Sequence, residues 1–498
     1  MSKYILSIDL GTTSMKAAVY QLDFTPVYTV QKGYQTTFPH EGWAQQHPDM
    51  WWKVLSEVVK ELLEKSRIAP SDIAVIGIDS MSSAVVPLDG EGNVLYPAML
   101  WMDRRARTEC DDIDYIFGNK FFTISGNHND PSNFGPKIMW LKMNEPDVYD
   151  KTSVILHANG FLAYRLTDEL TMDVSECGLS QLCYTAESAW SEELLTGCGI
   201  DREKLPEIRE CTSVIGKVTN RAAAITGLAA GTPVVAGSMD NVAAGVGAGL
   251  YQQHDVYVSA GTVTTVNSCI STPEYSEKMH LYRHAVPNRW LSVAGVDYGG
   301  AGLKWFKEIL ENDDFKEIDR LATEAVTRVN SPLFFPYMVG QRAPLWNDDT
   351  RGVLYGLTPA VTKGELLRTL MEGNVLGVRR IFGELNRMGV RPNQVRLTGG
   401  CANSTIWSEL FADILSMEVV IPGSGDVASL GSAMIAAVGA GIVDDFESAA
   451  ETIPIRETFT PHGEEIHRMY EKRMELFNTI YEKLEDTFHT FGASVKES

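Results

Sequence analysis

Short apolar runs separated by glycine-containing turns set the hydrophobic pattern at the start of each half of the chain. Apolar runs at residues 3–8 and 15–20 flank the turn Gly11-Thr12-Thr13-Ser14, which predicts a strand–turn–strand hairpin. Residues 256–269 show the same order around a second turn, Gly261-Thr262. The two Gly-Thr turns therefore predict an internal repeat that spans about half the chain.

Strand patterns alternate with helical patterns after each hairpin. In the first half, apolar residues at helical spacing over 49–65 precede a predicted strand at 73–78. The second half continues with predicted elements at residues 301–310, 363–388, 394–397, 403–415, 418–421, 428–440 and 464–488, the last being a long amphipathic helix. Strands that alternate with helices predict an α/β fold.

Chain length and composition limit the classes of protein that fit. A chain of 498 residues exceeds the ~250–300 residues of a single core, so we expect two domains, at residues 1–249 and 250–498. The net charge of −22 opposes a phosphate backbone, so no nucleic-acid partner is expected. No long uncharged apolar stretch, secretion signal or Cys-x-x-Cys pair occurs among the residues. We expect a cytoplasmic protein without a membrane partner, and the sequence leaves a homodimer open.

The two Gly-Thr turns have the chemistry of a phosphate site. Backbone N–H groups and hydroxyls gather on one side of such a turn, and two facing turns would clamp a polyphosphate, with Lys16 adding a positive charge. Asp9 precedes the first turn where Ser259 precedes the second. A carboxylate beside a phosphate is unfavourable unless a cation lies between them, which indicates Mg²⁺. Plain β-turns are the alternative interpretation.

Two further strand ends carry candidate functional residues. Asp240 follows a predicted strand at 233–236 and begins a helix of small residues. It is either a helix N-cap or a general base aimed at an incoming hydroxyl, and the two roles are compatible. Gly399-Gly400 lies between a predicted strand and helix, where it leaves room for a flat ring near Asn403; a tight turn is the alternative.

In this order and spacing, the motifs resemble the FGGY family of carbohydrate kinases, within the actin, Hsp70 and hexokinase superfamily. The resemblance covers nearly the whole chain. The matching segments are Asp9–Ser14 and Ser259–Thr262 for the phosphate motifs, 399–403 for the adenosine motif, 352–357 and 365–373 for the stretch that defines the family, and 42–46 and 101–105 for the sugar side.

The resemblance implies an α/β chain of two ribonuclease-H-like domains that bind ATP and a sugar in the cleft between them. It makes Asp240 the catalytic base and Asp9 the residue that acts on Mg²⁺. The expected ATP-binding residues are Thr12, Thr13, Lys16, Gly261, Thr262, Gly300, Gly400 and Asn403. The expected sugar-binding residues are Ser82, Ser83, Asp103, Asp240 and Asn241.

The sequence departs from the family pattern on the sugar side. Xylulose kinases usually carry Gly-Gln-Met-His-Gly after the strand at 73–78, whereas Ser82-Ser83 occupies the Met-His positions here. A histidine that could contact the sugar is therefore missing. We expect transfer of the γ-phosphate of ATP to a pentulose such as xylulose. The alternatives are gluconate, a glycerol-like polyol, or a non-catalytic nucleotide-binding regulator.

Overall fold

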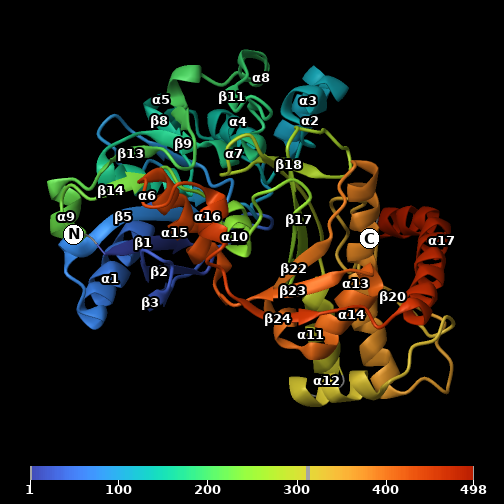
Figure 1. The fold of residues 1–498 in the computed structure, drawn as a ribbon. Coiled ribbons are helices and arrows are strands. Elements are labelled where there is room, and N and C mark those ends of the chain that lie inside the picture. The colour runs from blue at the N-terminus through green and yellow to red at the C-terminus, as the bar shows by residue number, and fades with distance from the viewer. Residues whose placement is uncertain (1–2, 310–313, 497–498) are drawn as a thin grey trace.

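The computed structural model describes residues 3–309 and 314–496, which form two α/β domains, each built on a seven-stranded sheet (Figure 1). The first sheet comprises β1 (Tyr4–Leu10), β2 (Ser14–Gln21), β3 (Pro26–Gly33), β5 (Ile73–Ser80), β13 (Val214–Lys217), β14 (Pro233–Val235) and β15 (Ser238–Met239). The second comprises β16 (Val256–Ala260), β17 (Thr264–Ile270), β18 (His280–Arg283), β19 (Trp290–Val296), β22 (Gln394–Thr398), β23 (Glu418–Pro422) and β24 (Ile455–Phe459). The expected two-domain α/β fold is confirmed.

Both predicted hairpins are present. β1 pairs antiparallel with β2 around the first Gly-Thr turn, and β16 pairs antiparallel with β17 around the second. Each first strand also has a parallel neighbour, β5 for β1 and β22 for β16. Because parallel strands end at the same edge of a sheet, this arrangement places the residues after β1 and β5 side by side.

Helices cover both faces of the first sheet. Helix α1 (Pro48–Ser66) and α6 (Ala158–Thr167) pack on the face that buries Leu6 and Ile8. Helices α10 (Asp240–Ala248) and α15 (Val427–Gly439) cover the opposite face, where Ile5 is buried. Adjacent residues of β1 thus serve two cores, which explains its nearly continuous apolar pattern.

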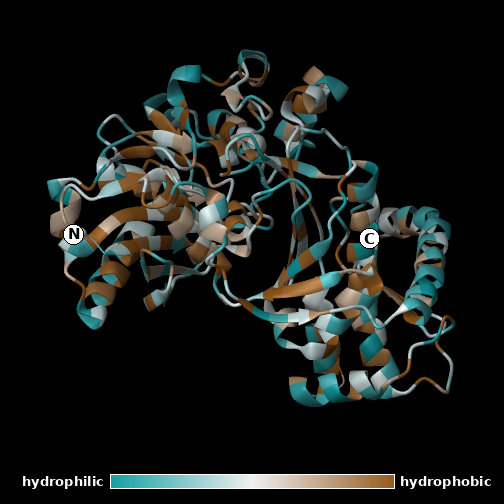
Figure 2. Cartoon of the chain, viewed as in Figure 1, coloured by the Kyte–Doolittle hydropathy of each residue, from teal (hydrophilic) through white to brown (hydrophobic). Residues whose placement is uncertain are grey.

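The second sheet packs against a long helix, α13 (Lys363–Arg387), with α11 (Gly299–Ile309) and α14 (Thr405–Leu415) beside it. The closing helix α17 (Glu464–Lys496) is tied to α13 by a buried ion pair: Arg473 Nη2 lies 2.8 Å from Glu372 Oε2. Figure 2 shows hydrophobic residues along strands and inner helices, whereas α17 is mostly hydrophilic.

Some predicted boundaries differ from the structure. The predicted helix at 403–415 is a 3₁₀ turn, Gly400–Asn403, followed by α14, because the Ser404 hydroxyl accepts the backbone N–H of Trp407 and caps a new helix. The sequence pattern missed a helical region, whose members are α2 (Arg107–Phe117), α3 (Asn119–Ser125), α4 (Phe134–Asn144), α5 (Pro146–Lys151), α6, α7 (Val174–Ser180), α8 (Glu192–Cys198) and α9 (Asn220–Thr226). Several of these helices, such as α7, are buried all round and carry no amphipathic period.

The described residues add two facts about chain class. Across 3–309 and 314–496, no helix combines the length and apolarity needed to cross a membrane. All seven cysteines are buried as free thiols.

Helix α15 belongs late in the sequence but packs on the first domain. Its contact with α10 is made by glycines: a Cβ added at Gly431 would lie 1.7 Å from the carbonyl oxygen of Ala243, and one at Gly247 would lie 1.9 Å from that of Val427. Backbone atoms cannot yield to such an overlap, so the close approach of the two helices requires glycine. The domain boundary between residues 249 and 250 therefore remains a prediction. Helix α15 follows that boundary in sequence but packs on the domain that precedes it.

We predict that Gly431→Ala destabilises the protein, because the added methyl group must push α10 and α15 apart, at a cost of about 1–3 kcal/mol. The matched control is Gly383→Ala in α13, where an added Cβ meets nothing within 4 Å; it should stabilise by about 0.5–1 kcal/mol. Thermal unfolding of both variants checks this prediction. Equal midpoints for the two would contradict the glycine contact.

Candidate active site

Carboxylates collect at one edge of the first sheet. Asp9, near the end of β1, is paired in register with Asp79 of β5, and Asp79 is paired with Ser238 of β15. Asp240 follows β15 directly as the first residue of α10. Asp426, the N-cap of α15, completes the group. Parallel pairing of short strands is thus what brings together residues distant in sequence.

Lys16 is the cation inside this group. It lies opposite Asp9 across the β1–β2 hairpin, and its Nζ is 2.9 Å from Asp426 Oδ2 and 3.6 Å from Asp9 Oδ2. A cavity of about 360 Å³ is lined by Asp9, Lys16, Asp240 and Asn241 together with Asp426. The structure therefore joins four of the predicted site residues and adds Asp426, whose only sequence signal is its position between a strand and a helix.

Burial governs the charge state of these carboxylates. Desolvation raises the pKa of Asp240 to about 7, although the side chain keeps some surface toward the cavity, and the negative charge of Asp9 adds to the shift. Burial likewise raises the pKa of Asp9, against the opposing effect of Lys16. Fully buried Asp79 has its pKa raised well above the usual range, by desolvation and then by Asp9 and Asp240. Such raised values mark a site short of positive charge.

A second cavity of about 580 Å³ lies beside the second Gly-Thr turn. Its lining brings together the predicted nucleotide residues Gly261, Thr262, Gly300, Gly400 and Asn403. Close approach at this turn needs glycine, since a Cβ at position 300 would lie 2.4 Å from the Gly261 carbonyl oxygen.

The nucleotide-side cavity also has lining residues that sequence reasoning missed. These are Lys304, Phe315, Lys316 and Trp407, which supply two positive charges and two aromatic rings. Lys304 lies in α11 and Trp407 in α14, where the sequence predicted helices but no role in a site. Phe315 and Lys316 begin α12 (Phe315–Glu324), a helix that the sequence pattern missed. Their location suits a flat ring joined to an anionic group.

Thr12 and Thr13 lie in the first turn but are not among the residues that line either cavity. The Thr12 hydroxyl accepts a hydrogen bond from Trp101 Nε1 at 2.9 Å, and the Thr13 carbonyl accepts the Tyr34 N–H at 3.0 Å. The first turn is thus held by Trp101, which belongs to the predicted sugar-side segment 101–105, and by Tyr34.

The predicted sugar-side residues divide into two kinds. Ser82 is partly exposed, whereas Ser83 is buried and its backbone is held at both ends. The Ser83 N–H donates to both oxygens of Glu176, at 3.1 and 3.3 Å, and its carbonyl accepts from Lys137 Nζ at 3.0 Å. Burial shifts the pKa of both partners to about 7, upward for Glu176 and downward for Lys137.

Asp103 is fully buried, so its carboxylate is not exposed for the sugar contact that was expected of it. One carboxylate oxygen accepts the Ala44 N–H at 2.6 Å, and Arg105 Nη2 lies 2.7 Å from the same atom. Arg105 in turn stacks 3.6 Å over the Trp43 ring. Asp103 therefore positions the Trp43 segment, and its carboxylate points at protein groups.

A buried hydrogen-bond network fixes the backbone at Asp240. The Met239 N–H donates to Ser175 Oγ at 2.9 Å, and the Ser175 N–H donates to Asp173 Oδ1 at 2.9 Å. Asp173 Oδ2 lies 2.9 Å from His157 Nε2. Next to Asp240, Asn241 Nδ2 donates to Asn267 Oδ1 of the second domain at 2.8 Å. These contacts hold Asp240 in place, and its Oδ1 also accepts the Asn241 N–H at 2.6 Å.

Two α/β domains, a carboxylate at a helix start and a cavity beside a Gly-Thr turn suit a phosphotransferase with an alcohol acceptor. Comparison with known proteins gives the family. Residues 4–247 match the N-terminal domain of the FGGY family of carbohydrate kinases and residues 256–440 match its C-terminal domain. The chain belongs to this family, and it is a sugar phosphotransferase that uses ATP.

Similar proteins cover nearly the full chain. Xylulose kinase of Escherichia coli strain K12 is 27% identical over 484 residues, 96% of this chain and 99% of the relative. Gluconokinase of Bacillus licheniformis is 27% identical over 503 residues, 98% and 97% of the two chains. The crystal structure of xylulose kinase from Rhodospirillum rubrum has a TM-score of 0.92 at 26% identity, covering 98% of this chain and 100% of that one.

Proposed function

We propose that Asp240 is the base in the transfer of the γ-phosphate of ATP to a hydroxyl of a pentulose such as xylulose, and that Mg²⁺ is required. The observation that carries the proposal is that adjacent residues at the ends of β16 and β22 line the two cavities. Ser259 and Gly399 line the carboxylate cavity, while Gly261 and Gly400, two residues and one residue further along the chain, line the nucleotide-side cavity. A polyphosphate that spans this junction ends beside Asp240.

The residues present fit a magnesium ion. Neither oxygen of Asp79 has a hydrogen-bond partner of standard geometry among the described residues, and the nearby carboxylates share only Lys16. No cluster of three or more ligating side chains suited to direct metal binding occurs within the described parts of the chain. Asp9 would therefore hold Mg²⁺ largely through water, as this ion prefers. A bound Mg²⁺ supplies neutralisation of phosphate charge.

The chain's own residues account for the remaining chemistry. Asp240 accepts the proton of the acceptor hydroxyl while the hydroxyl oxygen bonds to the γ-phosphorus. The bond from that phosphorus to the β–γ bridging oxygen breaks, and ADP leaves. The Gly261-Thr262 turn offers backbone N–H groups to the phosphates, with Thr12, Thr13 and Lys16 acting from the first turn. Gly300, Gly400 and Asn403 orient the nucleotide, and Asn241 with Ser82 and Ser83 orients the sugar.

The proposal of a pentulose acceptor is supported by relatives named xylulose kinase that match over nearly the whole chain. Gluconate is the second candidate. Relatives named gluconokinase match over a similar length, and Ser82-Ser83 lacks the histidine expected for a xylulose site.

We predict that Asp240→Asn lowers kcat by ~10²–10⁴-fold, the usual contribution of a positioned base. The amide cannot accept the proton, but it keeps the shape of the carboxylate, so ATP should still bind. Sugar-dependent ADP formation and nucleotide titration measure the two effects. Near-normal turnover in the variant would show that another group is the base.

Activity should depend on pH through Asp240. Its pKa is raised to about 7, so the carboxylate is protonated below that pH and is available as a base above it. We therefore expect log kcat/KM to fall with unit slope as the pH drops below about 7. Far-UV circular dichroism over the same range is the control for folding. A flat profile down to pH 5 would contradict the assignment.

A comparison of acceptors tests the substrate. ADP release should be measured with D-xylulose, other ketopentoses, gluconate and glycerol, with Asp240→Asn as the blank. We expect the largest kcat/KM with a ketopentose, because the full-length relatives include xylulose kinases. A larger kcat/KM with gluconate than with any ketopentose would identify gluconate as the substrate. The absence of ADP release with every acceptor would contradict the proposed chemistry.

A further inference from the structure

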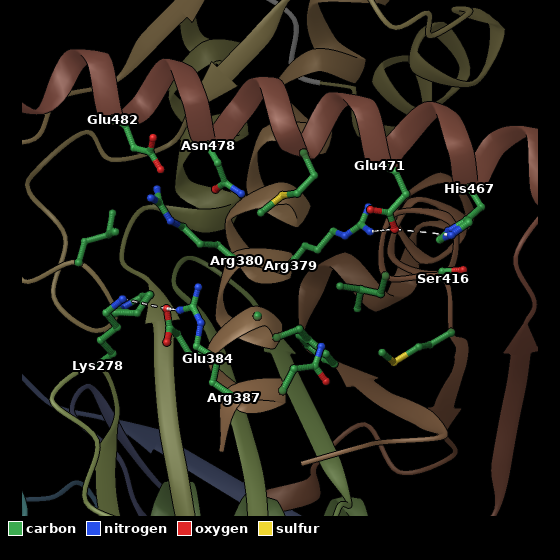
Figure 3. A pocket seen from close by; sticks show the side chains of 18 residues that line it. Lys278, Arg379, Arg380, Glu384, Arg387, Ser416, His467, Glu471, Asn478 and Glu482 are labelled. Atoms are coloured by element: carbon green, nitrogen blue, oxygen red, sulfur yellow. Dashed lines mark hydrogen bonds and ion pairs between the residues drawn. The ribbon is translucent and has the colours of Figure 1, made fainter. Parts of the chain in front are cut away.

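A third cavity, of about 560 Å³, lies away from the cleft, between helices α13 and α17 of the second domain (Figure 3). Arg379 and Arg380 project into it from α13, and Glu471, Asn478 and Glu482 face them from α17. Lys278 and Ser416 close its sides. None of the residues assigned above to the nucleotide, the sugar or the metal lines this cavity.

The lining is basic in a strongly acidic chain. Four Lys or Arg side chains face three Glu side chains there, whereas the whole chain has a net charge of −22. Two of the glutamates are already engaged, Glu471 with Arg379 and Glu384 with both Lys278 and Arg387. Arg380 has no ion-pair partner among the described residues; its guanidinium stacks 4.2 Å from the Tyr481 ring. The four cations of the lining thus exceed its three carboxylates by one, and Glu482 is the carboxylate of the lining that has no ion pair among the described residues.

Several polar atoms in this cavity lack partners. Arg379 Nη1 and Arg380 Nη1 are buried and have no hydrogen-bond partner among the described residues, and the same holds for Asn478 Oδ1 and His467 Nδ1. Buried donors without acceptors are unfavourable, and native structures contain few of them. Two arginine donors, an amide acceptor and an imidazole nitrogen are unsatisfied beside one cavity, which favours a polar ligand that offers both acceptor oxygens and hydroxyl donors.

A glycine in α13 leaves space for that ligand. Gly383 lies within the 25-residue helix and lines the cavity between Arg379 and Arg387. A Cβ added there would meet nothing within 4 Å, so no protein group requires glycine at this position. Alanine would favour the helix more. Packing therefore does not explain the glycine at position 383, and the space beside it can hold part of a ligand against α13.

We propose that this cavity binds a small phosphate monoester of the sugar-phosphate type. The guanidinium group of Arg380 offers N–H donors that match phosphate oxygens, and the ion-paired Arg379, Lys278 and Arg387 add positive charge around it. Asn478, Ser416 and Glu482 offer acceptors and donors suited to sugar hydroxyls. The proposal is independent of the chemistry in the cleft, because it uses none of the residues that carry it.

Calorimetric titration of the full chain with D-ribose 5-phosphate, in the absence of nucleotide, tests the proposal. We expect binding that weakens at least tenfold in Arg380→Gln. It should also weaken in Gly383→Leu, which fills the cavity without removing a charge. The matched control is Arg320→Gln on α12, an exposed arginine outside this cavity, which should bind as the wild type does. Sugar-dependent ADP formation by each variant shows that it is folded.

Three results would overturn the proposal. One is the absence of measurable binding at millimolar ligand. Another is unchanged affinity in both Arg380→Gln and Gly383→Leu, which would place the ligand elsewhere, the cleft included. The third is equal affinity for inorganic phosphate or for D-ribose, since a sugar phosphate site must use both parts of the molecule.

Discussion

The concentration of carboxylates around one lysine is the constraint on which the rest of the structure depends. Asp9, Asp79, Asp240 and Asp426 lie at the edge of one sheet and the start of two helices, and Lys16 is their shared cation. Burying carboxylates is costly unless they are paired or neutralised. Burial, and after it the charges of neighbouring carboxylates, raise the pKa values of Asp9, Asp79 and Asp240. A site with so little positive charge fits the magnesium ion proposed above.

The placement of these carboxylates requires a helix from the second half of the sequence to pack on the first domain. Asp426 reaches the first sheet only because α15 packs on it, and α15 can approach α10 only through Gly247 and Gly431. The helix that begins at Asp240 and the helix that follows Asp426 are therefore held by one contact between backbones. A movement between the domains that spared this contact would leave both carboxylates in place relative to each other.

Local sequence signals predicted the parts of the site that are built from single turns. Gly261, Thr262, Gly400 and Asn403 meet in one cavity because each lies near a strand end or helix start, where turn chemistry is visible in the sequence. Gly300, which was expected only from the family resemblance, lines the same cavity. Groups supplied by other elements left no such signal: Asp426, Phe315 and Trp407 take part only through packing between distant helices. Three of the missed helices at 107–226, α4, α6 and α7, are largely buried and show no clear amphipathic period, whereas α2 has an exposed face.

The acceptor side shows why motif comparison alone leaves the sugar open. Ser83 replaces a histidine, but its backbone is held by Glu176 and Lys137, two buried charges from α7 and α4 whose pKa values both lie near 7. A change in either partner would shift the Ser82-Ser83 segment without altering the motif itself. If Ser82 and Ser83 contact the acceptor as proposed, selectivity depends on these buried supports as well as on the residues that face the sugar, and only the latter are compared when motifs are aligned.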